Sequence, residues 1–239
     1  MKTLVAVAVA AFAASTFGQS MMMGRKMPEK ALKATGGWAV KPGSQQGEIA
    51  YVNCQSAAKK EWLQESIDGF VKATRFNITL KDGTFDFKSP KVVGNLSLFF
   101  VDDPTLPMSL IAPEAKWAVV NVAPLKSDKE PFFKARVKKQ ASRTMAILCG
   151  GYKSNYPGNL TDAITKVEEL DTHTNDALPV DVLGRFTPYL AAFGVTPAIM
   201  TTYANACRQG WAAQPTNDLQ RGVWNKVHET PSKPIKIEP

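Results

Sequence analysis

Residues 131–151 constrain the fold of this chain more than any other stretch, because they have the pattern of one long amphipathic helix. Apolar side chains recur at every fourth position, which places them on one face of an α-helix. Ile147 and Leu148 widen this face near its end. Pro131 suits the first turn of a helix, and the Gly150-Gly151 pair suits its end. The pattern predicts a helix that packs on a core through these residues: Phe133, Val137, Ala141, Met145 and Cys149.

The rest of this helix is strongly basic and has no acid among its cations, which are Lys134, Arg136, Lys138, Lys139 and Arg143. The chain has a formal net charge of +8, and a basic surface favours acidic partners. No aromatic residue lies between these cations, whereas binding of single-stranded nucleic acid favours such residues. We therefore expect an anionic glycan or cell-envelope polymer as the partner, and no specific nucleic acid. The alternative is a solvated face that meets the acidic residues 168–171 within the fold.

The segment before this helix predicts a sheet. Strands are predicted over residues 48–54, 96–101 and 117–122, and the second of these is nearly continuously apolar, as in the interior of a sheet. A helix is expected after Ser56. Residues 76–87 alternate around Asp82-Gly83, a pattern typical of a β-hairpin. The order of these elements predicts an α/β (α+β) fold, with helices packed on a mixed, twisted sheet.

The N-terminal residues have the pattern of a secretory signal peptide. Lys2 precedes an apolar run over residues 4–17, which is too short to span a membrane. We expect residues 1–18 to be removed by cleavage before Gln19. No later apolar run has membrane-spanning length. The mature protein is therefore expected to be exported and soluble, in the periplasm or outside the cell.

The mature chain divides by composition into four parts. Residues 19–46 are basic and rich in Gly and Pro turns, which predicts a flexible lead-in. Residues 47–171 are the predicted α/β core, and residues 172–229 a helical part packed on that core. Residues 230–239 contain three prolines and are expected to form an extended tail.

Within the helical part, three helix starts are predicted. Thr187-Pro188 and Thr196-Pro197 each combine a capping residue with proline at the first helical position. Thr216 or Asn217 can cap the last helix. That last helix is expected to turn these residues inward: Leu219, Val223, Trp224 and Val227.

Three successive elements carry a resemblance to a known family: the strand LSLFFVDD, the strand KWAVVNVAPL, and the long helix that ends at Gly150-Gly151. In this order they resemble the core of archaemetzincin-like proteins, a branch of the metzincin zinc peptidases, over residues 96–171. The resemblance implies a zincin-like core. In that family the helix carries the motif HExxHxxGxxH, whose three histidines bind zinc and whose glutamate is the general base for the attacking water.

The motif can be placed on this chain in two registers. If Gly151 takes the place of the motif's glycine, the ligand positions are Thr144, Leu148 and Ser154, and the position of the base is Met145. None of these side chains is a histidine or a carboxylate. This register therefore supplies no zinc site.

The second register is no better. If Gly150 is the motif's glycine, the ligand positions are Arg143, Ile147 and Lys153, and Thr144 takes the place of the base. The whole chain has two histidines, His173 and His228. A three-histidine zinc site is therefore impossible. The resemblance implies a scaffold without its metal, as in a pseudoenzyme, and we expect no catalytic residue, no metal ligand and no cofactor.

Two other residue groups could carry hydrolysis. Cys149 and His173 could act as a nucleophile and its base, but Cys149 falls on the apolar face, where a thiol keeps a high pKa. The pairs Asp102-Asp103 and Glu168-Glu169 could suggest acid–base chemistry on a glycan. Adjacent carboxylates on a strand point to opposite faces, so capping or ion pairing explains them better.

The sequence thus predicts a binding or scaffold protein, and its competitor is a secreted hydrolase with a carboxylate-based site. A cleft lined by Asp or Glu would favour the hydrolase. A cleft filled by Phe133, Met145 and Trp117 would favour the binding protein. The three cysteines allow one disulfide, but Cys149 and Cys207 lie on apolar helix faces, so we expect them to be buried free thiols.

Overall fold

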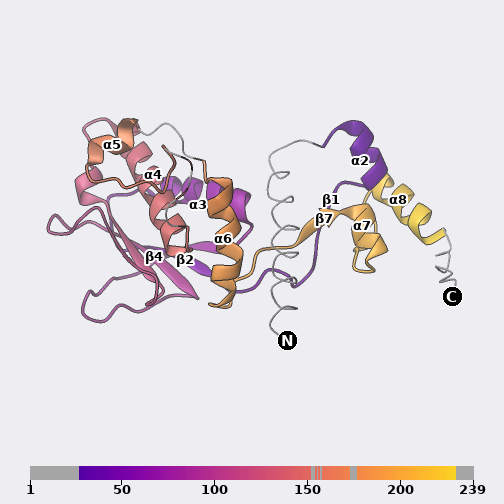
Figure 1. The fold of residues 1–239 in the computed structure, drawn as a ribbon, viewed down its shortest axis with the longest axis horizontal. Coiled ribbons are helices and arrows are strands. Elements are labelled where there is room, and N and C mark those ends of the chain that lie inside the picture. The colour runs from indigo at the N-terminus through magenta and orange to yellow at the C-terminus, as the bar shows by residue number, and fades with distance from the viewer. Residues whose placement is uncertain (1–26, 152–153, 155, 157, 173–176, 230–239) are drawn as a thin grey trace. The chain divides into compact units, whose positions relative to one another are not determined.

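The computed structural model describes residues 27–151, 154, 156, 158–172 and 177–229 (Figure 1). These residues fall into two compact units. Unit 1 is Gln45–Pro197, and unit 2 consists of the described parts of Gly24–Ser44 and Ala198–Pro239. The predicted signal peptide and the predicted tail lie outside the described residues. Within the described part, no helix combines the length and the apolar character needed to cross a membrane.

Unit 1 is built on a five-stranded sheet with the order β3-β2-β4-β6-β5. Its strands are β2 (Ile49–Asn53), β3 (Ile78–Asp82), β4 (Leu96–Val101), β5 (Ser109–Ala112) and β6 (Trp117–Asn121). The first four in this order are parallel, and β5 is an antiparallel edge strand. Every residue of β2 and β4 is buried, as their continuous apolar runs require. The mixed α/β fold is confirmed.

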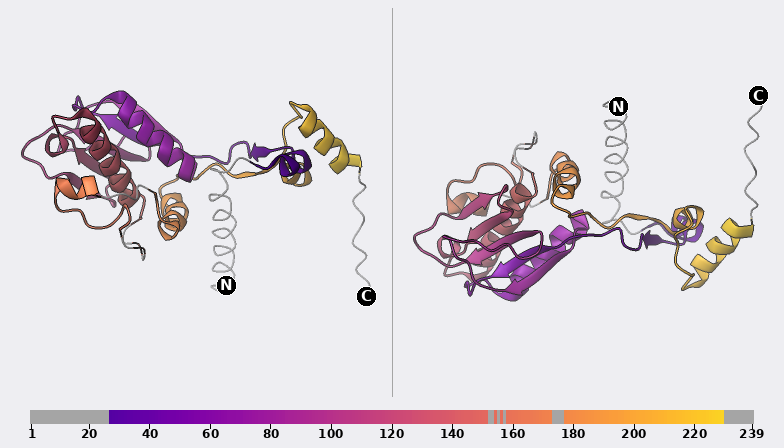
Figure 2. Two further views of the ribbon diagram at one scale, coloured as in Figure 1. Left: turned by 90° about the horizontal axis from the view of Figure 1, so that it is seen from above. Right: turned by 90° about the horizontal axis from the view of Figure 1, so that it is seen from below.

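Helices cover one face of this sheet (Figure 2). They are α3 (Lys60–Thr74), α4 (Glu130–Leu148) and α6 (Val180–Ala191), with the short α5 (Val167–Thr172) and the 3₁₀ turn η1 (Ala123–Leu125) beside them. Helix α4 is the helix predicted over residues 131–151, and Val137, Ala141 and Met145 from its apolar face are fully buried. The rings of Trp62 on α3 and Phe133 on α4 meet edge to face, 5.2 Å apart.

Helix α4 ends where the glycine pair predicted it would. Gly150 has φ +85°, a left-handed conformation that side chains other than glycine rarely adopt. A Cβ atom on Gly150 would lie 2.7 Å from Cγ of Tyr189, and one on Gly151 would lie 2.5 Å from Cε1 of Phe186. Both aromatic rings belong to α6. The two glycines therefore end α4 and let α6 approach its end closely.

The other face of the sheet is covered by loops, and this corrects the predicted hairpin. Strand β3 pairs in parallel with β2, and no strand returns after Asp82-Gly83. The ring of Phe85 instead packs against Phe99 and Trp117 on the loop-covered face. The alternation of residues 76–87 correctly indicated β3, but the residues after Gly83 cover the sheet and do not form a second strand.

The region after α4 differs from the prediction in two ways. Pro188 lies inside α6, not at a helix start. The helix expected from Pro197 begins only at Tyr203, because residues 200–202 form a strand and Thr202 is the cap, its side chain accepting a hydrogen bond from the backbone N–H of Asn205. Helix α6 packs in the core of unit 1 through Val182, Phe186 and Leu190.

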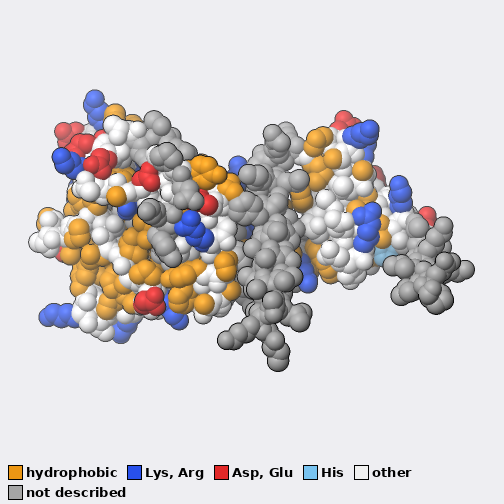
Figure 3. All heavy atoms as spheres, viewed as in Figure 1, with side chains coloured by type: hydrophobic (Ala, Val, Ile, Leu, Met, Phe, Trp, Pro, Cys, Tyr) orange, Lys and Arg blue, Asp and Glu red, His pale blue; other side chains and the backbone are white. Residues whose placement is uncertain are grey.

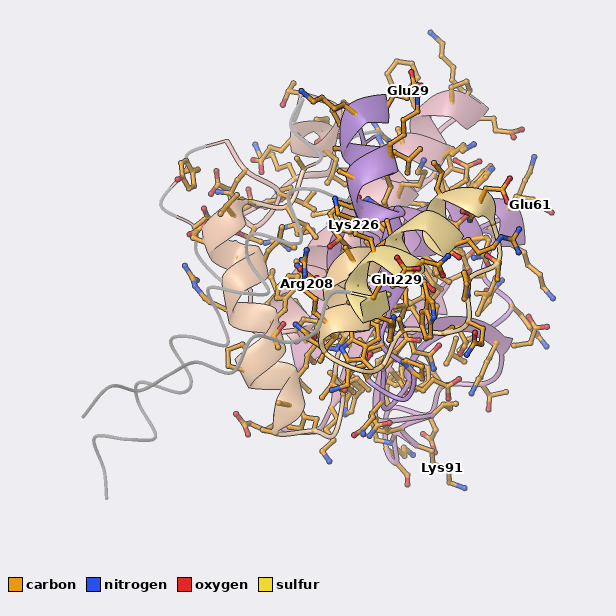
Figure 4. The ribbon with its side chains drawn as sticks, turned by 90° about the vertical axis from the view of Figure 1, so that its right-hand side faces the viewer. Glu29, Glu61, Lys91, Arg208, Lys226 and Glu229 are labelled. Atoms are coloured by element: carbon orange, nitrogen blue, oxygen red, sulfur yellow. The ribbon has the colours of Figure 1, made fainter. Side chains whose placement is uncertain are left out.

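Unit 2 is a small α/β assembly. It contains α2 (Glu29–Thr35), β1 (Trp38–Val40), β7 (Met200–Thr202), α7 (Tyr203–Arg208) and α8 (Asp218–Glu229). Strands β1 and β7 pair antiparallel, so the segment that we expected to be a flexible lead-in supplies a helix and a strand. In Figure 4 the labelled Glu29, Arg208 and Glu229 lie on the surfaces of these helices.

The last helix follows the prediction except at one residue. Asn217 accepts a hydrogen bond from the backbone N–H of Gln220 at 3.0 Å, so it caps α8. Val223 is buried and packs with Tyr203 and Cys207 of α7. Leu219, which was expected to face inward, is 36% exposed.

Candidate binding groove and the basic helix

The structure places the five predicted basic residues on α4 and gives each a contact within unit 1. Two of them share one carboxylate of α3. Nζ of Lys134 is 2.7 Å from Oε1 of Glu65, and Nζ of Lys138 is 2.9 Å from Oε2 of the same residue. Hydrogen bonds from Lys134 and Lys138 lower the pKa of Glu65. The single carboxylate of Glu65 therefore pairs with two ammonium groups, so one positive charge of this group of three side chains is not neutralised.

The other three cations turn towards residues 162–171. Arg136 donates two hydrogen bonds to the carboxylate of Asp171, at 2.9 and 2.6 Å. Lys139 donates to the carbonyl of Leu170 at 2.8 Å, and Arg143 to the carbonyl of Asp162 at 3.1 Å. Figure 3 shows acidic and basic side chains intermixed over the region of α5. Arg136 and Lys139 therefore contact the acidic segment 168–171 within the fold, whereas Lys134 and Lys138 pair with Glu65.

The positions that would hold zinc in the first register do not fit a metal. Thr144 and Leu148 are fully buried, and the Thr144 hydroxyl accepts a hydrogen bond from the side-chain amide of Gln140 at 3.2 Å. Met145, at the position of the base, has its sulfur 3.6 Å from the thiol of Cys149. Ser154 donates to Asp181 at 2.9 Å. Neutral hydroxyl, thioether and hydrocarbon groups are not the imidazole and carboxylate ligands that zinc takes.

The second register fits no better. Arg143 is engaged with the backbone of Asp162, and Lys153 lies outside the described residues, as does His173. The remaining histidine, His228, stacks on Trp224 in α8 and bonds to the carbonyl of that residue. Within the residues that the structure describes, no three His, Cys, Asp or Glu side chains are placed to hold a metal ion.

The carboxylates proposed for hydrolysis each bind a different partner. Asp102 pairs with Lys126 at 2.8 Å. Asp103 accepts hydrogen bonds from Thr105, and Glu169 from Thr165, and these bonds lower the pKa of both carboxyl groups. A general acid of a glycosidase needs a raised pKa. These contacts fit capping and ion pairing.

The three thiols have the burial and the pKa shifts of structural cysteines, not those of catalytic nucleophiles. All three cysteines are free, and Cys149 and Cys207 are buried as expected. Burial raises the pKa of Cys149, and it raises the pKa of the half-buried Cys54 to about 11. A thiol with a raised pKa is a poor nucleophile near neutral pH.

The structure adds a groove that the sequence did not reveal. It lies between α3 and α4, is bordered by the segments around Leu160 and Leu178, and has a volume of about 390 Å³. Of the five predicted basic residues, Lys138 and Lys139 line it, and Glu65 is the one acidic residue among the described residues of its lining. Phe133, Met145 and Trp117 do not line it; Trp117 packs on the opposite, loop-covered face. The groove thus matches neither cleft that was expected.

Comparisons with known proteins bear on the fold. No protein family matches the sequence, and no curated protein is similar to it. Among solved structures, archaemetzincin from Methanopyrus kandleri is similar with a TM-score of 0.50 and 14% identity, over 64% of this chain and 99% of that one. Archaemetzincin from Archaeoglobus fulgidus gives a TM-score of 0.45 at 10% identity, over 58% and 99%. The zinc-dependent peptidase from Methanocorpusculum labreanum gives 0.44 at 11%, over 59% and 100%. The first of these similarities shows that the chain shares the zincin-like fold of archaemetzincin.

Proposed function

We propose that this chain is an exported, non-catalytic binding protein that uses an archaemetzincin-like fold without its zinc site. One observation carries the proposal: the part of α4 that corresponds to the zinc motif is packed into the core. Thr144, Met145 and Leu148 are fully buried, and none of them can serve as a zinc ligand or a general base of the metzincin kind.

Two features support binding of an anionic partner. The Lys134 and Lys138 ammonium groups share the single Glu65 carboxylate, so this side of unit 1 keeps an excess of positive charge. The Lys134 and Lys138 side chains are 35% and 38% exposed, and exposed ion pairs are weak enough for a competing anion to exchange with them. An anionic glycan or envelope polymer is the macromolecular partner that this charge would suit. The apolar N-terminal run supports export.

The competing hydrolase has less support. Its candidate carboxylates, Asp102 and Asp103, are held by Lys126 and Thr105 respectively. Glu65 lines the groove but is paired with two lysines. Among the described residues that line the groove, Glu65 has no second carboxylate beside it.

A cleavage assay tests the proposal. The mature protein, with and without added zinc, is incubated with a mixed peptide library and a mixed oligosaccharide library, and the products are identified by mass spectrometry. We expect no cleavage in either condition. Cleavage that follows the protein through purification would overturn the proposal. Loss of that cleavage in the Asp102→Asn/Asp103→Asn variant would assign it to the carboxylates.

A further inference from the structure

We propose that Arg75, at the end of α3, binds the carboxylate of a small ligand. This inference goes beyond the proposed function, because Arg75 is not one of the basic residues of α4. Arg75 directly follows α3 and is only 6% exposed. Its guanidinium nitrogens Nε and Nη1 are fully buried and make no hydrogen bond. Buried polar groups nearly always have a partner, so these two atoms point to a group that binds there.

Arg75 differs in this respect from the other arginines that the structure describes. Each of the other five donates a side-chain hydrogen bond: Arg136, Arg143, Arg185, Arg208 and Arg221. Hydrogen bonding to Asp171 raises the pKa of Arg136. Burial lowers the pKa of Arg75, and no described carboxylate offsets this effect. Among the described residues, Arg75 is therefore a buried cation without a counter-ion.

Neither side-chain packing nor the helix explains this cation. Long cationic side chains often bury their hydrocarbon stem and keep the charged group in water. In Arg75, however, two nitrogens of the charged group itself are buried. The C-terminal end of a helix attracts a cation, but this attraction is weaker than the cost of removing a charge from water. An anion beside the guanidinium would offset that cost.

The backbone of Arg75 is held in place on both sides. Its N–H donates to the carbonyl of Val71 at 2.7 Å, and its carbonyl accepts from the side-chain amide of Gln45 at 2.9 Å. The flanking residues Thr74 and Phe76 are buried. The third guanidinium nitrogen, Nη2, is not among the fully buried atoms, so a ligand can reach the group there. Binding of a second oxygen at Nε requires a small shift of the side chains that cover that atom.

The chemistry of a single guanidinium selects a carboxylate. Its planar fork of N–H donors matches two oxygens of a carboxylate or of a phosphate. Arg75 supplies one positive charge, and no other described charge acts on it. A carboxylate neutralises that charge. A phosphate group carries about 1.5 to 2 negative charges at neutral pH, which would leave negative charge uncompensated in buried surroundings.

Acetate is the probe for this site, and the Nε–H signal of Arg75 in NMR spectra of the full mature chain is the readout. Its absence from the spectrum of Arg75→Met assigns the signal. Acetate is titrated against sodium chloride at the same ionic strength. We expect a saturable shift of the Arg75 signal, and at least 10-fold weaker binding of inorganic phosphate. The absence of a saturable shift would overturn the proposal, and equal binding of phosphate would contradict the preference for a carboxylate.

Melting curves of two matched variants provide a second test. Arg75→Met removes the charge and keeps an apolar stem, whereas Arg208→Met makes the same change at an exposed arginine that ends α7. Acetate should raise the melting temperature of the wild type and of Arg208→Met, because a ligand stabilises the state that binds it. It should leave Arg75→Met unchanged; an equal rise in this variant would place the acetate elsewhere and contradict the proposal.

The same variant tests whether the charge of Arg75 lacks a partner in the free protein. Without acetate, Arg75→Met should melt no lower than the wild type, because it removes a buried charge that nothing neutralises. A clearly lower melting temperature would mean that the fold already compensates the charge, and would count against the site. Failure to bind acetate leaves the cleavage assay unaffected, so this proposal and the proposed function fail separately.

Discussion

The two halves of α4 differ in what holds them. Its first half presents Lys134, Arg136 and Lys138 at the surface, where they contact Glu65 and Asp171 through ion pairs. Its second half, residues 139–148, supplies six of the seven buried residues of the helix. In the first motif register considered above, two of the three expected ligand positions, Thr144 and Leu148, fall in this second half. The difference teaches that α4 is anchored by the packing of its second half, while the charges of its first half remain at the surface.

The largest effect is expected in the second half. Leu148→Ala should lower the free energy of unfolding of unit 1 by about 2–5 kcal/mol, because Leu148 is fully buried and its truncation leaves a cavity. Phe132→Ala is the control on the first half of the same helix, where the side chain is 48% exposed, and it should cost much less. Chemical denaturation measures both. Equal losses would contradict the distinction between the two halves.

A smaller effect, which depends on pH, is expected from the pair of Arg136 and Asp171. Hydrogen bonds from Arg136 lower the pKa of Asp171 in the folded protein. The pair therefore contributes stability above the unfolded pKa of aspartate, about 3.9, and this contribution is lost as the pH falls through the lower folded pKa.

The test compares the wild type with Asp171→Asn in denaturation experiments between pH 7 and pH 2. The wild type should be more stable at pH 7 by less than about 1 kcal/mol, since both side chains are partly exposed. The difference should shrink as the solution becomes acidic. A difference that stays constant over the whole range would show that the ion pair is not its cause.

The smallest effect is expected from Lys134→Ala. Lys138 remains paired with Glu65 in this variant, and exposed ion pairs contribute little. The melting temperature should not change measurably. The double variant Lys134→Ala/Lys138→Ala leaves Glu65 without either lysine, and it serves as the comparison. A clear loss from the single change would mean that the first half of α4 also anchors the helix.

Much of unit 1 could be predicted from the sequence because its signals are local. The spacing of apolar residues placed α4, and the continuous apolar runs placed β2, β4 and β6 within a residue or two at each end. The edge strand β5, which lies between Pro107 and Pro113, was missed. The hairpin was wrong because strand alternation does not say which strand is the partner. The partner of β3 is β2, which lies before α3 in the chain.

The groove could not be predicted from the sequence, because it forms only when α3 and α4 come together with Leu160, Ala177 and Leu178. A serine and a glycine inside a helix are ordinary residues. Only in the fold do Ser66 and Gly69 line a groove, with empty space beside Gly69. A glycine within an otherwise strong helical pattern was the one local sign of this site.

The metal content of the purified mature protein tests the central claim most directly. Elemental analysis is combined with melting curves recorded with and without a strong chelator. The account predicts no stoichiometric zinc and the same melting temperature in both curves, because the second half of α4 is packed without metal ligands. Stoichiometric zinc whose removal lowers the melting temperature would contradict the account and favour the enzyme interpretation instead.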